Sequence, residues 1–127
     1  MATTSRLPLP NTPNQDNTGR ALTYQFQNPA YAATLSIVTT AFETVVLVAP
    51  LTGALTLNIG VGSSTAPPYV GDSVTFLFSS TPGETVTLGT GISASAGTLV
   101  IAAGKKGSIS FTFDGATWVE TGRAVTV

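Results

Sequence analysis

The stretch Lys106–Arg123 restricts the fold of this chain more than any other part of it. Two runs of alternating residues flank the dipeptide Asp114-Gly115. Asp-Gly between alternating apolar runs is a strong signal for a β-hairpin, because both central residues of a type I′ turn need positive φ. A two-residue loop fixes the register, and it predicts that Phe111 lies opposite Trp118. The apolar face predicted for the hairpin, which would form one wall of the core, consists of Ile109, Phe111, Phe113, Ala116 and Trp118.

Short strand-like runs continue from Leu22 to the end of the chain, and no segment has a convincing helical period. Gly and Pro clusters separate these runs at intervals near ten residues, which is typical of a sandwich or a barrel. Gly89–Gly97 is expected to be a loop of small residues, and Gly104–Gly107 a turn leading into the hairpin. Before the hairpin we expect strands within Leu22–Gln27, Ala33–Thr39, Glu43–Leu51, Ala54–Ile59, Asp72–Ser79, Thr85–Leu88 and Thr98–Ala102, and after it an edge strand at Ala124–Val127. The predicted fold is all-β, a jelly-roll-like β-sandwich over residues 21–127.

The first twenty residues differ from the rest of the chain. They are rich in Pro, Thr and Asn and show no periodicity, and their three prolines disfavour both helix and central strand. One interpretation is a disordered tail, and the other is an extended arm that anchors the domain to a neighbouring subunit. The residues expected to anchor such an arm to a capsid are Arg6, Leu7, Leu9 and Arg20.

The last part of the chain, roughly from Gly71 to Val127, resembles a C-terminal segment common in structural proteins of tailed bacteriophages. In that segment a strand and a Gly-Lys-Lys/Asp turn lead into a hairpin that ends in DGxxWVExxR. The residues that carry the resemblance are Lys105, Lys106, Asp114, Gly115, Trp118, Val119, Glu120 and Arg123. The resemblance implies a virion component such as a fibre, spike or capsid decoration, and the homotrimer that is frequent among phage fibres and decoration proteins.

Charge is scarce in this sequence. Charged residues make up 9% of the chain, against about 25% in ordinary soluble domains. Glu43 is the single charged residue between Ala21 and Gly71. A small domain with so little charge repels its own copies weakly and tends to associate. The alternative is a monomer whose surface is hydrated by its many Thr, Ser and Asn side chains.

The sequence argues against several classes of function. It contains no Cys and no His, which removes the usual nucleophile–base pairs and the commonest metal ligands. Neither a cofactor nor a metal site is expected, and catalysis is not expected either. Five Lys and Arg against six Asp and Glu do not form a nucleic-acid footprint, and no apolar run is long enough to cross a membrane as a helix. Lys105-Lys106 is expected to be a solvated turn, or otherwise a small anion site.

These observations favour a non-enzymatic virion protein. We expect a capsid decoration or head-fibre component that self-associates, as a trimer according to the resemblance, and that attaches to capsid or other virion proteins through its N-terminal arm. The alternative is a tail-fibre or baseplate domain that binds a glycan on the host surface. Trp118 is expected to lie in the core, so Tyr69, which follows Pro67-Pro68 in a loop, is the candidate contact for a glycan.

Overall fold

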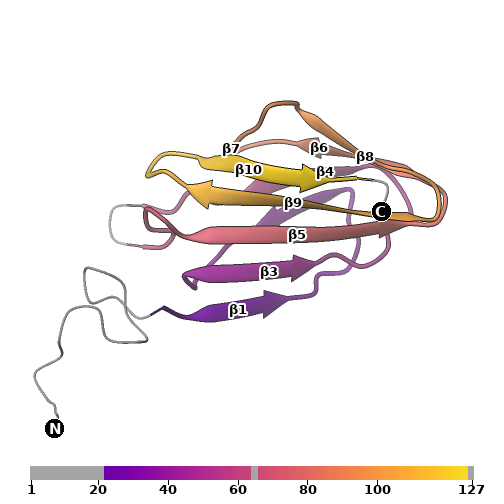
Figure 1. The fold of residues 1–127 in the computed structure, drawn as a ribbon. Helices are drawn as coiled ribbons and strands as arrows, with labels where there is room; N and C mark the ends of the chain where they lie inside the picture. The colour runs from indigo at the N-terminus through magenta and orange to yellow at the C-terminus, as the bar shows by residue number, and fades with distance from the viewer. Residues whose placement is uncertain (1–21, 64–65, 126–127) are drawn as a thin grey trace, which may run out of the picture.

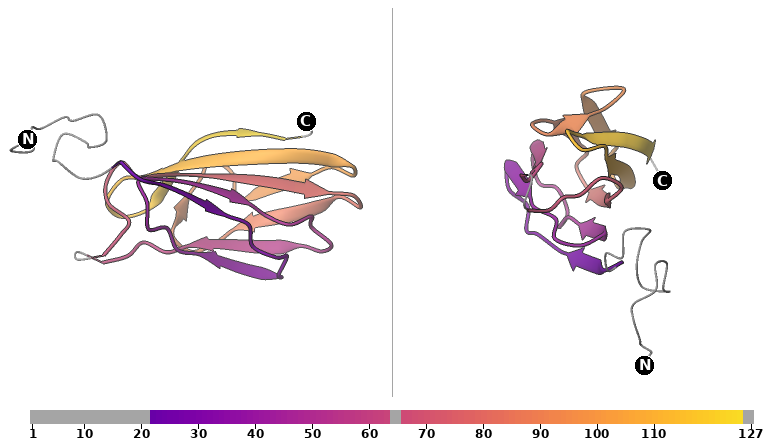
Figure 2. Two further views of the ribbon diagram at one scale, coloured as in Figure 1. Left: turned by 90° about the horizontal axis from the view of Figure 1, so that it is seen from below. Right: turned by 90° about the vertical axis from the view of Figure 1, so that its left-hand side faces the viewer.

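The computed structural model describes residues 22–63 and 66–125, which form ten β-strands in two sheets and contain no helix. Figure 1 looks onto the larger sheet, and the left view of Figure 2 shows the two sheets as two layers. The six-stranded sheet contains, in spatial order, β1 (Tyr24–Gln27), β3 (Glu43–Leu47), β5 (Ser73–Ser80), β9 (Lys105–Phe113), β10 (Trp118–Ala124) and β7 (Ile92–Ser93). The four-stranded sheet contains β2 (Thr34–Ile37), β4 (Leu55–Ile59), β6 (Glu84–Leu88) and β8 (Thr98–Ile101). This confirms the prediction of an all-β chain arranged as a sandwich.

The first six strands alternate between the two sheets. Odd-numbered strands join the larger sheet and even-numbered strands join the smaller one, so the chain winds as a two-layer coil. Strands one coil apart run in the same direction, and β1–β3, β3–β5, β2–β4 and β4–β6 are therefore parallel pairs. The predicted jelly-roll connectivity is not confirmed, because jelly rolls are built from antiparallel strands in Greek keys.

The core lies between the sheets and is lined by alternate residues of the long strands. Phe76 on β5 packs edge-on against Phe111 on β9, with ring centroids 6.0 Å apart, and stacks on Phe78 at 6.1 Å. From the smaller sheet, Leu57 and Ile101 reach the same space and are completely buried. Full burial of an aliphatic or aromatic side chain contributes about 1.5–3 kcal/mol, so this layer supplies the main stabilisation of the fold.

The hairpin is present, but its register differs from the predicted one. Phe113 lies opposite Trp118, and Phe111 lies opposite Glu120. The loop therefore has four residues instead of two, and Ala116 belongs to it. The register has moved by two residues, which is the period of side chains in a strand, so every predicted apolar residue on the strands keeps its face. Phe111, Phe113 and Trp118 are all buried as expected.

Two predicted connections are also corrected. The expected loop Gly89–Gly97 contains the short strand β7, which pairs in parallel with β10 and brings Ile92 against the core. Of the expected turn Gly104–Gly107, Gly104 is a turn residue, but Lys105–Gly107 are strand, because β9 begins at Lys105 and pairs with β5 from there. The residues between β8 and β9 carry the chain from one sheet to the other.

The apolar side of β1 faces outward. Tyr24 and Phe26 are exposed, while Gln25 and Gln27 are half-buried beside the inward-facing residues of β3. The two amides are satisfied there: Gln25 Oε1 accepts from the Thr40 backbone N–H at 3.3 Å, and Gln27 Nε2 donates to the Val38 carbonyl at 3.0 Å. The strand predicted within Leu22–Gln27 is confirmed, and its residues alternate with the large side chains on the solvent side.

Candidate interaction surface

The four-residue hairpin loop is held by Asp114. Its Oδ1 accepts from the backbone N–H groups of Ala116 and Thr117, both at 2.8 Å. The bonds from Thr117 and Ala116 lower the pKa of this carboxyl below its ordinary value. Gly115 has φ of 103°, a conformation that residues with a Cβ rarely adopt. The Asp-Gly pair therefore serves the turn, as the sequence predicts, through a longer loop than a type I′ hairpin.

Trp118 joins the hairpin to the rest of the core. Its ring is completely buried and lies 5.3 Å from that of Phe113, measured between centroids. Its indole Nε1–H donates to the backbone carbonyl of Gly60 at 3.0 Å. Because a buried indole N–H needs an acceptor, this bond fixes Trp118 as a core residue and removes it from the candidates for an exposed sugar platform.

Glu120 and Arg123 form an ion pair that connects the two layers. On a regular strand residues three apart face opposite sides, but the register between β10 and β9 shifts between Glu120 and Gly122, which leaves Thr121 as an extra residue. Glu120 and Arg123 therefore share one side, and Arg123 Nε donates to Glu120 Oε2 at 2.6 Å. Arg123 also donates to the carbonyls of Thr98 and Ala96 at 2.8 and 3.0 Å.

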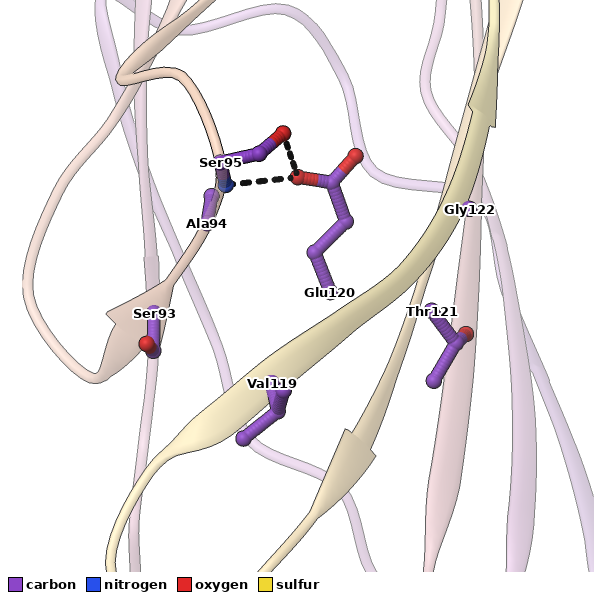
Figure 3. A pocket seen from close by; sticks show the side chains of 7 residues that line it. All are labelled: Ser93, Ala94, Ser95, Val119, Glu120, Thr121 and Gly122. Atoms are coloured by element: carbon purple, nitrogen blue, oxygen red, sulfur yellow. Dashed lines mark hydrogen bonds between the residues drawn. The ribbon is translucent and has the colours of Figure 1, made fainter.

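Figure 3 shows Glu120 reaching from β10 towards Ser95, which follows β7. Its Oε1 accepts from the backbone N–H and the hydroxyl of Ser95, at 3.1 and 3.2 Å, and from Arg123 Nη2 at 2.9 Å. The hydrogen bond from Arg123 is the main cause that lowers the pKa of Glu120 from 4.5 to about 2. The carboxylate accepts four hydrogen bonds in all, and in this depression it holds β10 to the residues that follow β7.

Tyr69, the predicted glycan contact, lies in a cleft at one end of the sandwich. The cleft measures about 430 Å³ and also includes Val61, Pro68, Val70 and Ala116. Tyr69 is held by its backbone, since its N–H donates to Asp72 Oδ2 at 2.9 Å and its carbonyl accepts from the Asp72 N–H at 3.0 Å. The ring is exposed, and apolar side chains form most of the cleft around it.

The two lysines of the Lys105-Lys106 pair do not converge. They are successive residues at the start of β9, and both are exposed. Successive side chains of a strand point to opposite faces, so Lys106 projects from the outer surface of the larger sheet while Lys105 turns towards the other side. Their placement in a strand corrects the prediction of a turn, and the geometry does not favour a shared anion site.

The outer surface of the six-stranded sheet carries an apolar patch at its β1 end. The exposed fractions of its side chains are 62% for Tyr24, 54% for Phe26, 41% for Leu47 and 38% for Leu77. Val45, which is half-buried, lies beside Phe26 in the register and fills the space between these residues. We call these five side chains the apolar patch. They lie on neighbouring strands, because β1 pairs with β3 and β3 pairs with β5 (Figure 1).

The outer surface of the four-stranded sheet is lined by hydroxyl groups. The register places Thr34 beside Thr56, Thr56 beside Thr87 and Thr87 beside Thr98, so that one threonine from every strand forms a row. Outside this row the exposed valines Val38 and Val100 lie on the two edge strands or just beyond them. Among the residues that the structure describes, this surface therefore has no continuous apolar area.

The predicted anchoring residues Arg6, Leu7, Leu9 and Arg20 lie outside the described residues. Within residues 22–63 and 66–125, no group of three or more acidic side chains is placed to hold a metal ion. The same part of the chain includes no helix that is long and apolar enough to cross a membrane.

No protein-family model matches this sequence, and no curated protein is similar enough to it to count as a relative.

Proposed function

We propose that this protein is a non-enzymatic structural subunit that associates with copies of itself and belongs to the particle of a tailed bacteriophage, as a capsid decoration or head-fibre component. The apolar patch is the observation that carries the self-association. The phage assignment rests on the resemblance of the C-terminal segment, which also implies a trimer.

The apolar patch supports self-association for a physical reason. Each exposed Å² of apolar surface that becomes buried contributes about 25 cal/mol, and contiguous exposed apolar side chains on a soluble chain mark an interaction site. Four of its five residues lie between Ala21 and Gly71, where Glu43 is the single charged residue. Little charge has to be desolvated when this surface is covered.

The residues of the resemblance support a structural role. Asp114 and Gly115 form the loop, Trp118 fills the core, and Glu120 with Arg123 joins the layers. Each of these residues is used to hold the hairpin and the edge of the sandwich together. The carboxylates of Asp114 and Glu120 are engaged in hydrogen bonds, which supports a non-enzymatic protein.

Attachment to the particle is proposed to depend on residues 1–20. We expect that a variant without them keeps the melting temperature and the self-association of the full chain but no longer binds particles that lack the native protein. Binding of the truncated variant at full occupancy would place the attachment site on the β-domain instead.

Light scattering at micromolar concentration tests the self-association. We expect a mass above that of one chain, 12.9 kDa, that persists in moderate salt, because apolar burial is not screened as exposed ion pairs are. A monomeric mass across the accessible concentrations would contradict the proposal.

The second candidate function is glycan binding by a tail-fibre or baseplate domain. It is favoured by the exposed ring of Tyr69 in the end cleft, since aromatic rings are common platforms for sugars. Binding of the protein to a glycan array that is lost in Tyr69→Ala, with an unchanged melting temperature, would support this function. Equal binding by the variant would show that Tyr69 does not contact the glycan.

A further inference from the structure

The outer surface of the six-stranded sheet carries two charged side chains among the described residues, Glu43 and Lys106. Glu43 lies opposite Ser73 in the pairing of β3 with β5, and Lys106 lies opposite Ser79 in the pairing of β9 with β5. Ser73 and Ser79 stand near opposite ends of β5. The two charges therefore have opposite signs and occupy opposite ends of the same surface.

The midpoint between these charges falls on β5. Since β5 lies between β3 and β9, and Ser73 and Ser79 bound its outward-facing residues, the midpoint is close to Thr75 and Leu77. Leu77 belongs to the apolar patch. A two-fold axis can lie in the plane of the surface, perpendicular to the line from Glu43 to Lys106, and pass over this point. Because that line runs mainly along the strands, such an axis approximately reverses the strand direction of a second copy. It thereby brings the Glu43 end of each copy over the Lys106 end of the other.

We propose that the apolar patch is covered by the same surface of a second copy of this chain, packed face to face about such a two-fold axis, with Glu43 of each copy beside Lys106 of its partner. This inference rests on the proposed self-association and specifies its surface and symmetry. It replaces the trimer implied by the resemblance with a two-fold contact, in which one surface pairs with itself.

Two features favour a second copy in this arrangement. The surface complements itself in charge, so a two-fold contact places Glu43 of each copy beside Lys106 of the other and forms both ion pairs at once. Pairing through the free edge of β1 is disfavoured, because that strand has four residues and because an edge contact extends the sheet without covering the patch. Face-to-face packing buries the patch and leaves the hydroxyl row on the other sheet in water.

A charge exchange tests the inference on the full chain. We compare the wild type with Glu43→Lys, Lys106→Glu and the double variant by sedimentation equilibrium at low salt. The two-fold axis repeats the pair, so each single change replaces two attractions by two repulsions. We expect each single variant to raise the dimer dissociation constant about tenfold, which corresponds to about 1.4 kcal/mol, and the double variant to restore it. Lys105→Glu is the matched control, because it makes the same change of net charge on the neighbouring residue that faces the other way.

Each outcome of this experiment decides the inference. A dimer with the expected pattern, and with no effect of Lys105→Glu, supports it. Single variants that bind like the wild type, or a double variant that fails to recover, would overturn it. A trimeric wild type would overturn the two-fold contact and leave the proposed function standing, whereas a monomer would overturn both. Equal melting temperatures of the diluted variants ensure that the changes report association and not unfolding.

Discussion

The outer surfaces of the two sheets differ in what they present to solvent. The six-stranded sheet presents the contiguous apolar patch of Tyr24, Phe26, Val45, Leu47 and Leu77. The four-stranded sheet presents a row of threonines, one from each strand. Aromatic residues and threonine both favour strands. The formation of a sheet therefore does not explain why one outer surface is apolar and the other is hydroxylated. Hydroxyl groups are readily hydrated and apolar rings are not. We therefore expect the first surface to be covered in the proposed assembly and the second to remain in water.

The largest effect is expected in the core that supports both surfaces. Trp118→Ala removes a completely buried ring and its bond to Gly60. We expect a loss of about 3–5 kcal/mol in the free energy of unfolding, measured by denaturant titration of the diluted protein. Because the core supports both sheets, this loss of stability should affect the two sheets equally. A loss below about 1 kcal/mol would place Trp118 outside the core and strengthen the glycan-binding alternative.

The next effect should separate the two surfaces. Leu77→Lys places a charge in the apolar patch, and Thr87→Lys places the same charge in the hydroxyl row, each on an interior strand of its sheet. We expect Leu77→Lys to raise the dissociation constant of self-association by about 30-fold or more, as the loss of a central contact does, and Thr87→Lys to leave it unchanged. Analytical ultracentrifugation measures both. Equal effects of the two variants would remove the distinction between the surfaces.

A smaller effect is expected at the edge that joins the sheets. In the folded protein the pKa of Glu120 is about 2, lowered from 4.5 chiefly by its hydrogen bond from Arg123. Because this pKa is lower in the folded state, the stabilisation is fully present above pH 4.5 and is lost as the pH falls towards 2. Glu120→Gln should reduce the free energy of unfolding by about 1–2 kcal/mol at pH 6.

The pH dependence tests the same ion pair. The difference in unfolding free energy between the wild type and Glu120→Gln should shrink between pH 4.5 and pH 2, whereas self-association at pH 6 should not change, since the pair lies on the inner side of β10. A difference that stays constant down to pH 2 would show that Arg123 does not hold this carboxylate.

For the hairpin, the sequence predicts correctly which face of the sheet each strand residue occupies. It does not predict correctly which residue lies opposite it on the other strand. Alternation places Phe111, Phe113 and Trp118 on one side of the sheet in every register that differs by two residues. The length of the loop then selects the cross-strand partners, and Asp114 sets that length through its bonds to the backbone. The parallel coil could not be predicted, because alternation within a strand says nothing about which strand lies beside it.

The sequence suggested self-association but did not locate the apolar patch. Scarce charge indicated self-association, but the pattern of Tyr24 and Phe26 resembles that of the buried Phe76 and Phe78, and the inward position of Gln25 depends on its bonds to another segment. The ion pair between Glu120 and Arg123 could not be predicted either. Regular alternation puts residues three apart on opposite faces, and only the extra residue in β10 brings these two to the same face. Such features arise from tertiary contacts that local patterns do not record.

Oxidative footprinting of the tyrosines tests the central claim most directly. In the single chain the exposed fraction of Tyr24 is 62% and that of Tyr69 is 42%, so Tyr24 should react faster with hydroxyl radicals in dilute solution. At concentrations where the protein is associated, we expect Tyr24 to become the slower of the two while Tyr69 keeps its rate. A Tyr24 that remains the faster site in the associated protein would show that the apolar patch is uncovered, and would contradict the account.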